Sequence, residues 1–267
     1  MLLNNENYYS QEANREYLSV SQYKDFVGTY GKTGCEEYAL AKLDGRWVEN
    51  MEDSNALMVG SYVDAHFEGT LDLFKAKHSC MFKRDGGLQA KYLKANEMIQ
   101  RCERDELFMQ YMSGEKQVIM TAEMFGAKWK IKIDSYHPDK CIVDLKTCQS
   151  ITKEFYHSDT GHLNFLAEWG YYIQGAVYQK VVEINTGKKL PFFIAAVSKE
   201  KEPDLQIIAV EQSLLDEALT DVEHNVPKIL ALKNGALNPI RCEHCDYCKH
   251  TRILHAPIWS SELIGNV

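Results

Sequence analysis

Three consecutive segments in the middle of the chain alternate apolar and polar residues and constrain the fold more than any other feature. They cover residues 118–125, 128–136 and 141–148, and turn-forming residues at Gly126-Ala127 and at 137–140 separate them. Alternation with a period of two is typical of β-strands that bury one face. The middle of the chain therefore predicts a three-stranded meander.

The flanking sequence predicts helices on both sides of this meander, followed by a second pair of strands. The predicted helices cover residues 19–26, 56–77, 89–112, 165–183 and 213–233, and the two further strands cover 192–198 and 205–210. This order predicts an α+β (mixed α/β) fold. Residues 1–18 are polar and are expected to form a loose arm, whereas 19–267 are expected to form a single domain.

The charge balance limits how the protein can contact nucleic acid. Thirty Lys and Arg oppose thirty-eight Asp and Glu, which gives a net charge of −8. The protein therefore does not coat nucleic acid by bulk charge, and basic residues are expected to gather near the meander, with Lys130, Lys132, Lys153 and Lys180 as candidates. The polar start predicts no signal peptide, and no apolar run reaches membrane length, so a cytoplasmic location is expected.

Two aspartates are expected to face each other across the second and third strands. If the turn centres on Asp139, the register pairs Asp134 with Asp144 and Lys132 with Lys146. Opposed like charges repel, and a divalent cation with oxygen ligands would offset this repulsion. Lys146 lies on the face of Asp144, where it can orient an attacking water.

The same pattern has a simpler interpretation. Alternating Asp and Lys residues also form solvated polar strand faces without a metal. The hairpin before Asp134 is expected to contain such a pair, with Glu123 opposite Lys130.

Three motifs, in order, resemble those of one nuclease superfamily. Asp134 followed by Asp144-Leu145-Lys146 is similar to the catalytic signature of the PD-(D/E)xK nucleases, and Gln174 with Tyr178 resembles the Gln-x-x-x-Tyr motif of their RecB-like exonuclease branch. Residues 60–68 resemble the first motif of that branch, in which a histidine follows the glycine by four residues; here that position is Asp64, and His66 lies two residues further on.

The resemblance implies a role for each matching residue. Asp134, Asp144 and Lys146 would be catalytic, and Gln174 and Tyr178 would contact substrate. Mg²⁺ or Mn²⁺ would be held by Asp64, Asp134, Asp144 and Leu145, where Leu145 can offer only backbone atoms. We favour Asp64 over His66 as the first ligand because Asp64 shares a helical face with Glu68.

A cluster of thiols near the C-terminal end predicts a second metal site. Cys242, Cys245 and Cys248 are spaced by three residues and are one ligand short of a tetrahedral site. Cys35 is the best fourth candidate, since its surroundings resemble nucleases in which one early and three late cysteines hold a [4Fe–4S] cluster. Zinc with His244, His250 or His255 as fourth ligand, or three free thiols, are the alternatives.

Taken together, the ordered motifs between residues 19 and 248 resemble phage or prophage RecE-type exonucleases. The family implies a central mixed sheet flanked by helices and a metal-dependent nuclease that degrades one strand from a DNA end in recombination or repair. A single-strand annealing protein is an expected partner, and ring-shaped homo-oligomers occur among relatives. Two other hypotheses remain: a non-cleaving DNA-binding or assembly module with the same fold, and a zinc-stabilised scaffold whose carboxylates have no catalytic role.

Overall fold

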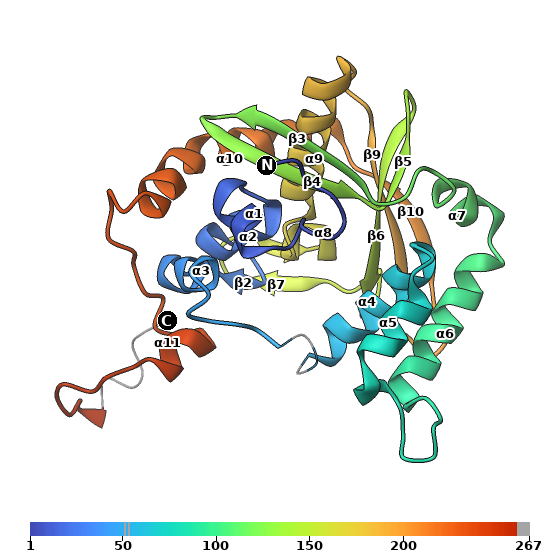
Figure 1. Cartoon of the computed structure of the whole chain (residues 1–267), viewed down its shortest axis with the longest axis horizontal. Coiled ribbons are helices and arrows are strands. Elements are labelled where there is room, and N and C mark those ends of the chain that lie inside the picture. Colours follow the sequence, from blue (N-terminus) through green and yellow to red (C-terminus); the bar gives the residue numbers. More distant parts are fainter. Residues whose placement is uncertain (51, 53, 261–267) are drawn as a thin grey trace.

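A four-stranded mixed sheet forms the centre of the protein in a computed structural model that describes residues 1–50, 52 and 54–260. The strand order is β10-β9-β6-β5, in which β6 and β9 run parallel and the other neighbours antiparallel. The strands are β5 (Ser135–His137), β6 (Cys141–Cys148), β9 (Phe192–Ser198) and β10 (Leu205–Ala209). This sheet and its flanking helices confirm the predicted fold class (Figure 1).

Both faces of this sheet are buried, so alternate residues of one strand enter different cores. On β6, Ile142 packs in the larger core together with Phe192 and Ile194 of β9, whereas Val143 and Leu145 pack in a second core on the opposite face. Burial on both faces is typical of a strand with a parallel neighbour. Polar residues on β6 therefore lie inside the protein.

Helices from two regions of the chain cover the two faces (Figure 1). One face carries α4 (Asn55–Phe67), α5 (Leu71–Lys77), the short 3₁₀ helix η2 (Ser79–Met81), α6 (Ala90–Glu103) and α7 (Glu106–Tyr111). The opposite face carries a separate hairpin, β3 (Val118–Met124) and β4 (Ala127–Ile133), with α9 (Tyr171–Thr186) and α10 (Gln212–Lys233).

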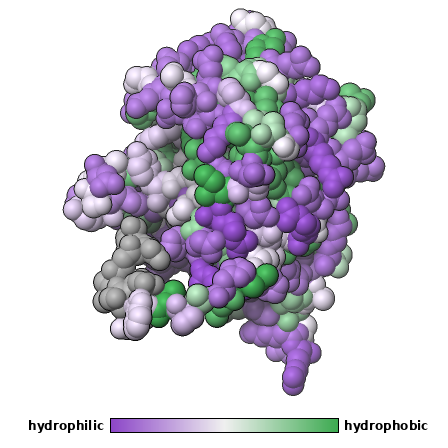
Figure 2. All heavy atoms as spheres, turned by 90° about the vertical axis from the view of Figure 1, so that its left-hand side faces the viewer, coloured by the Kyte–Doolittle hydropathy of each residue, from purple (hydrophilic) through white to green (hydrophobic). Residues whose placement is uncertain are grey.

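Shorter elements complete the chain on the side of α10. They are α1 (Gln11–Glu16), α2 (Val20–Val27), β1 (Gly28–Thr29), β2 (Lys32–Thr33), α3 (Glu36–Leu43), β7 (Phe155–His157), β8 (Gly161–Leu163), α8 (Phe165–Glu168) and α11 (Asp246–His250). Figure 1 places α11 next to α3, although two hundred residues separate them, and Figure 2 shows a mostly hydrophilic surface on this side of the molecule.

The expected helices form, but three of them are interrupted. The helix predicted for 56–77 breaks at Gly69, which has a φ of 76°, and the one predicted for 165–183 breaks at Gly170, with a φ of 63°. The helix predicted for 89–112 breaks at Asp105, whose side chain caps α7. Glycine adopts positive φ at little cost, and a capping side chain satisfies free N–H groups, so each break has a local cause.

The predicted meander is wrong in two respects. The turn after β3 consists of Phe125 and Gly126, both with positive φ, so Glu123 pairs with Lys128 and not with the expected Lys130. Two positive φ angles favour a two-residue hairpin turn, which shifts the register. The strand predicted for 128–136 also divides at Asp134 into β4 and β5, so Lys132 pairs with Ile119 rather than with Lys146.

The N-terminal segment, residues 1–18, differs from the loose arm that the sequence predicts. It contains α1 and buries Tyr8, Ala13, Tyr17 and Leu18. Leu18 also forms a parallel bridge to Trp129 of β4. Although the segment is mostly polar, its few apolar side chains are buried and attach it to the β3–β4 hairpin.

The described residues show no helix that combines the length and the apolar character needed to cross a bilayer. Residues 261–267, at the end of the domain predicted for 19–267, lie outside the described part of the chain.

Candidate active site

Five carboxylates line one cavity of about 480 Å³; Asp25 pairs with Lys32 and Lys42, and the other four come from three parts of the chain. Asp64 and Glu68 are one helical turn apart on α4, Asp134 lies between β4 and β5, and Asp144 lies on β6. The cavity also contains Lys146, Gln174 and Tyr178. The residues that the sequence predicts for catalysis, metal binding and substrate contact therefore converge.

Two hydrogen bonds hold the carboxylate of Asp134, which lies between β4 and β5. One carboxylate oxygen accepts a hydrogen bond from the backbone N–H of Leu145 at 2.9 Å, and the other accepts one from Gln117 Nε2 at 3.4 Å. The register of β5 and β6, in which Ser135 pairs with Val143, places Asp134 beside Asp144 as predicted. Burial and the Asp144 carboxylate raise the pKa of Asp134 to about 7.

Sequence reasoning missed Gln117. Its backbone has a φ of 54°, which is uncommon for a residue with a side chain. This conformation comes just before β3, where it directs the side-chain amide to Asp134. No sequence pattern indicates this role, because a glutamine before a strand is ordinary.

Asp144 is almost completely buried, with 2% of its surface exposed. Gln174 Nε2 donates to one of its oxygens at 2.6 Å, and Lys146 Nζ lies 2.5 Å from the other. Apart from this ion contact, the second oxygen is buried without a further hydrogen-bond partner among the described residues.

Lys146 carries a positive charge in this environment. Burial alone would lower its pKa, but the carboxylate of Asp144, with further contributions from Tyr171 and Asp134, raises it well above the usual value. Its ammonium also lies 5.0 Å from the centroid of the Tyr171 ring. A lysine in this state can position water or offset negative charge, but it is a poor proton acceptor.

The first motif places Asp64, and not His66, in the cavity. His66 Nε2 pairs instead with Glu103 of α6 at 2.8 Å. At Gly60, a Cβ atom would lie 3.2 Å from Thr147 Oγ1, so the glycine lets α4 approach the end of β6 closely. Burial and the nearby Asp134 raise the pKa of Asp64 well above its usual value.

The donor set fits a hard divalent cation. Three carboxylates from the predicted ligand set share the cavity with Leu145, and one buried oxygen of Asp144 has no hydrogen-bond partner among the described residues, so oxygen ligands for such a cation are at hand. The raised pKa values of Asp64 and Asp134 show that these groups resist carrying negative charge together without compensation. Asp64, Asp134, Asp144 and the backbone of Leu145 could hold Mg²⁺ or Mn²⁺, and Glu68 adds a further carboxylate that the predicted set omits.

Gln174 and Tyr178 both line the cavity, but the structure engages their side chains with protein atoms. Gln174 binds Asp144, and the Tyr178 hydroxyl donates to the backbone carbonyl of Lys132 at 3.1 Å. These two hydrogen bonds connect α9 to β6 and to β4. A role in substrate contact stays a prediction for both residues.

The basic residues around the cavity differ partly from the expected set. Lys130 and Lys132 line it, whereas Lys153 contacts Gln149 and Lys180 pairs with Glu183 elsewhere. The lysines that sequence reasoning missed are Lys24 and Lys42, which α2 and α3 bring to the cavity.

Lys24 lies close to the catalytic candidates. Its ammonium donates to the backbone carbonyl of Trp169 at 2.8 Å. The same ammonium lies 5.1 Å from the centroid of the Tyr171 ring, and the Lys146 ammonium lies 5.0 Å from that centroid. Burial, together with the charge of Lys146, lowers the pKa of Lys24 to about 7. Near pH 7 Lys24 is therefore only partly protonated, and an anionic ligand in the cavity would favour its charged form.

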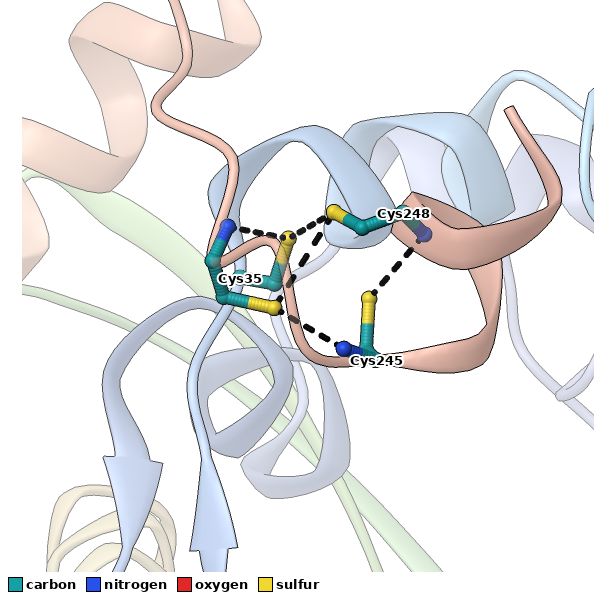
Figure 3. Close-up of side chains that lie close together, drawn as sticks. Cys35, Cys245 and Cys248 are labelled. Carbon is teal, nitrogen blue, oxygen red and sulfur yellow. Dashed lines mark hydrogen bonds between the residues drawn. The ribbon is translucent and has the colours of Figure 1, made fainter. Parts of the chain in front are cut away.

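The four predicted cysteines form a cluster between α3 and α11. The sulfur atoms of Cys35, Cys242, Cys245 and Cys248 all lie within 4.8 Å of one another. Figure 3 shows Cys35 from one chain segment close to Cys245 and Cys248 from the other. Cys35 Sγ lies 3.6 Å from Cys248 Sγ. The four cysteines complete a set of four ligands without a histidine.

Backbone N–H groups support the cysteine sulfurs. Cys245 and His244 donate to Cys242 Sγ at 3.2 and 3.4 Å, and Cys242 donates to Cys35 Sγ at 3.4 Å (Figure 3 draws several of these bonds). Burial raises the pKa of Cys242, but these donors overcome it and bring the pKa to about 7. Such donors stabilise thiolates, the form that binds metal.

The mixed sheet, with an aspartate and an Asp-x-Lys sequence facing one cavity, defines a protein with the fold of the PD-(D/E)xK nucleases. The chain belongs to the family of the PDDEXK-like domain of unknown function (DUF3799), whose model matches residues 19–251. This result confirms the predicted superfamily.

A solved structure supports the same assignment. The crystal structure of a "Putative exonuclease" from Eubacterium rectale is similar to this chain, with 57% sequence identity, a TM-score of 0.97 and coverage of 100% of both chains. No curated protein matches the sequence.

Proposed function

We propose that the protein is a divalent-metal-dependent deoxyribonuclease that hydrolyses phosphodiester bonds at DNA ends. The observation that carries this proposal is the convergence of Asp134, Asp144 and Lys146 in one cavity. The name of the similar Eubacterium rectale protein and the nuclease-like fold support it. The motif resemblance further supports a role in phage-type recombination or repair, with a single-strand annealing protein as partner.

Each residue has a definite task in this reaction. A divalent cation held by Asp64, Asp134, Asp144 and Leu145 would polarise the phosphate and promote ionisation of water. The Lys146 ammonium orients the attacking water and offsets the charge that develops on the phosphate oxygens. Gln174 and Gln117 fix the carboxylates of Asp144 and Asp134 through the hydrogen bonds described above.

The cavity can accept one nucleotide. Its volume of about 480 Å³ lies within the range of sites that enclose one small molecule. Action at DNA ends rests on the resemblance of the motifs to those of the RecB-like exonuclease branch.

Cleavage of two DNA forms tests the proposal. We expect the protein to degrade end-labelled linear DNA with Mg²⁺ or Mn²⁺ and to leave closed circular DNA intact, and we expect Asp144→Asn to abolish the degradation. Cutting of circles would exclude the restriction to ends. Binding of DNA without cleavage would instead favour the non-cleaving module.

For the four cysteines we propose a single tetrahedral zinc ion rather than an iron–sulfur cluster. Thiolates at about 2.3 Å from one zinc lie roughly 3.8 Å apart at the corners of a tetrahedron. The Sγ separations of 3.6 Å for Cys35–Cys248 and 4.0 Å for Cys242–Cys248 match that spacing. In a [4Fe–4S] cluster each cysteine binds a different iron, so the sulfurs lie farther apart.

Elemental analysis of anaerobically purified protein distinguishes the two metals. We expect one zinc per chain and no absorption in the visible range. About four irons per chain and a brown colour would contradict the zinc proposal and support the iron–sulfur cluster, while leaving the proposed nuclease function unaffected.

A further inference from the structure

Two adjacent tyrosines of the N-terminal segment have opposite environments. Tyr8 is 6% exposed and Tyr9 is 71% exposed, although both line the cavity of the candidate active site. Their rings meet edge to face with centroids 4.9 Å apart. Tyr8 therefore belongs to the protein interior, whereas Tyr9 presents an aromatic ring at the mouth of the cavity.

A buried lysine fixes this segment in place. Lys130 of β4 is 1% exposed, and its ammonium donates to the backbone carbonyl of Tyr8 and, at 2.7 Å, to Asn14 Oδ1. The same ammonium lies 4.6 Å from the centroid of the Tyr8 ring. These contacts stabilise a buried charge that would otherwise be costly. They therefore hold the N-terminal segment in a fixed position, where it lines the cavity.

Tyr9 lines the cavity that also holds the carboxylates. Partial burial raises the pKa of Tyr9 to about 12, with further contributions from Asp134, Glu68 and Asp64. Lys132 Nζ lies 5.3 Å from the centroid of the Tyr9 ring and covers one face of it. With 71% of its surface exposed, Tyr9 is accessible to a ligand.

We propose that Tyr9 stacks on the base of the terminal nucleotide whose phosphate lies at Asp134 and Asp144, and that the site thereby selects a single-stranded DNA end. This inference rests on the proposed function. Stacking suits an enzyme that must accept any sequence, because every base has an aromatic face. Lys132, next to the ring, supplies positive charge that offsets the acidic centre near the incoming strand.

Binding can be measured without cleavage. A single-stranded oligonucleotide with 2-aminopurine at its end and a non-hydrolysable terminal linkage should lose fluorescence on binding to the parent protein in Mg²⁺, because stacking quenches this base. Tyr9→Phe keeps the ring and should retain both quenching and affinity. Tyr9→Ala should lose the quenching and bind about tenfold more weakly, within the 5- to 150-fold range of one base–aromatic stack.

Tyr156→Ala is the matched control. Tyr156 is also 71% exposed, but it lies on β7 and does not line the cavity. This variant should bind and quench like the parent. Both Ala variants should melt within about 2 °C of the parent, since each replaces an exposed side chain.

Three results would overturn the inference: no quenching by the parent, Tyr9→Phe behaving like Tyr9→Ala, or an equal loss in Tyr156→Ala. Cleavage kinetics separate this inference from the proposed function. Tyr9→Ala should raise KM for single-stranded ends more than it lowers kcat. Parental kinetics in Tyr9→Ala would refute the stacking role alone, whereas quenching by a parent that never cleaves would refute the nuclease alone.

Discussion

Gln174 Nε2 donates a hydrogen bond of 2.6 Å to Asp144 Oδ1, which joins the helix motif to the strand motif. The bond fixes the plane of a carboxylate that is 2% exposed. Since the other oxygen contacts Lys146, Gln174 decides which lone pairs of Asp144 face the cavity. Gln174 thus affects the site indirectly, by orienting the carboxylate of Asp144.

The first prediction follows from this bond. Gln174→Ala should lower the cleavage rate by about 10- to 100-fold, the usual effect of losing a partner that orients a metal ligand. The free energy of unfolding should change by less than about 2 kcal/mol. Single-turnover cleavage and thermal melting measure the two effects. Normal cleavage together with a melting point several degrees lower would assign Gln174 to packing.

The second prediction concerns Lys146. Lys146→Ala should retain Mn²⁺ binding, because the ligands remain, and should lower cleavage by at least about 10³-fold, because its charge acts in the transition state. Calorimetric titration of Mn²⁺ and cleavage of a linear substrate test these two outcomes. Lys153→Ala serves as control, since Lys153 contacts only Gln149 and Phe155 among the contacts described. Parental cleavage by Lys146→Ala would exclude this residue from the chemistry.

The third prediction is a pH dependence of stability without metal. Burial and Asp144 raise the pKa of Asp134 to about 7, whereas an aspartate in an unfolded chain has a pKa of about 3.9. Between these values the folded protein binds more protons at Asp134 than the unfolded chain does. The contribution of protonated Asp134 to the free energy of unfolding is therefore fully present below about pH 4 and is lost as the pH rises towards 7. The loss can reach about 4 kcal/mol.

Thermal melting in EDTA between pH 4 and 8 measures this effect. The parent should melt at lower temperature as the pH rises, and Asp134→Asn should show a smaller slope because its amide does not titrate. Added Mg²⁺ should raise the melting point more at pH 8 than at pH 5, since protons compete for the same oxygens. A slope unchanged by Asp134→Asn would show that other groups cause it.

The fourth prediction concerns the cysteine site. Cys245→Ser should release zinc and destabilise the protein by roughly 3–5 kcal/mol, the scale of opening a long closed loop. Cys80→Ser is the control, because Cys80 is an exposed cysteine outside the cluster. Zinc content and thermal melting are the readouts. Full zinc occupancy in Cys245→Ser would show that the metal has other ligands.

Local patterns in the sequence determined the elements and much of the site. Alternation predicted β6, and a turn centred on Asp139 predicted the register that pairs Ser135 with Val143. A period of two or 3.6 residues is a property of neighbours in the chain, so it can be read without the fold. Each of the three motifs occupies one face of its element, and residues of all three line one cavity.

Only the tertiary structure decided which distant residues complete the site. Gln117, Lys24, Lys42 and Tyr9 reach the cavity from segments without a recognisable motif, and the N-terminal segment packs on β4 although its composition is polar. The turn at Phe125 and Gly126 likewise depended on backbone angles that no residue type requires. Contacts between remote segments depend on the summed packing of the whole chain, and a local pattern contains no information about that sum.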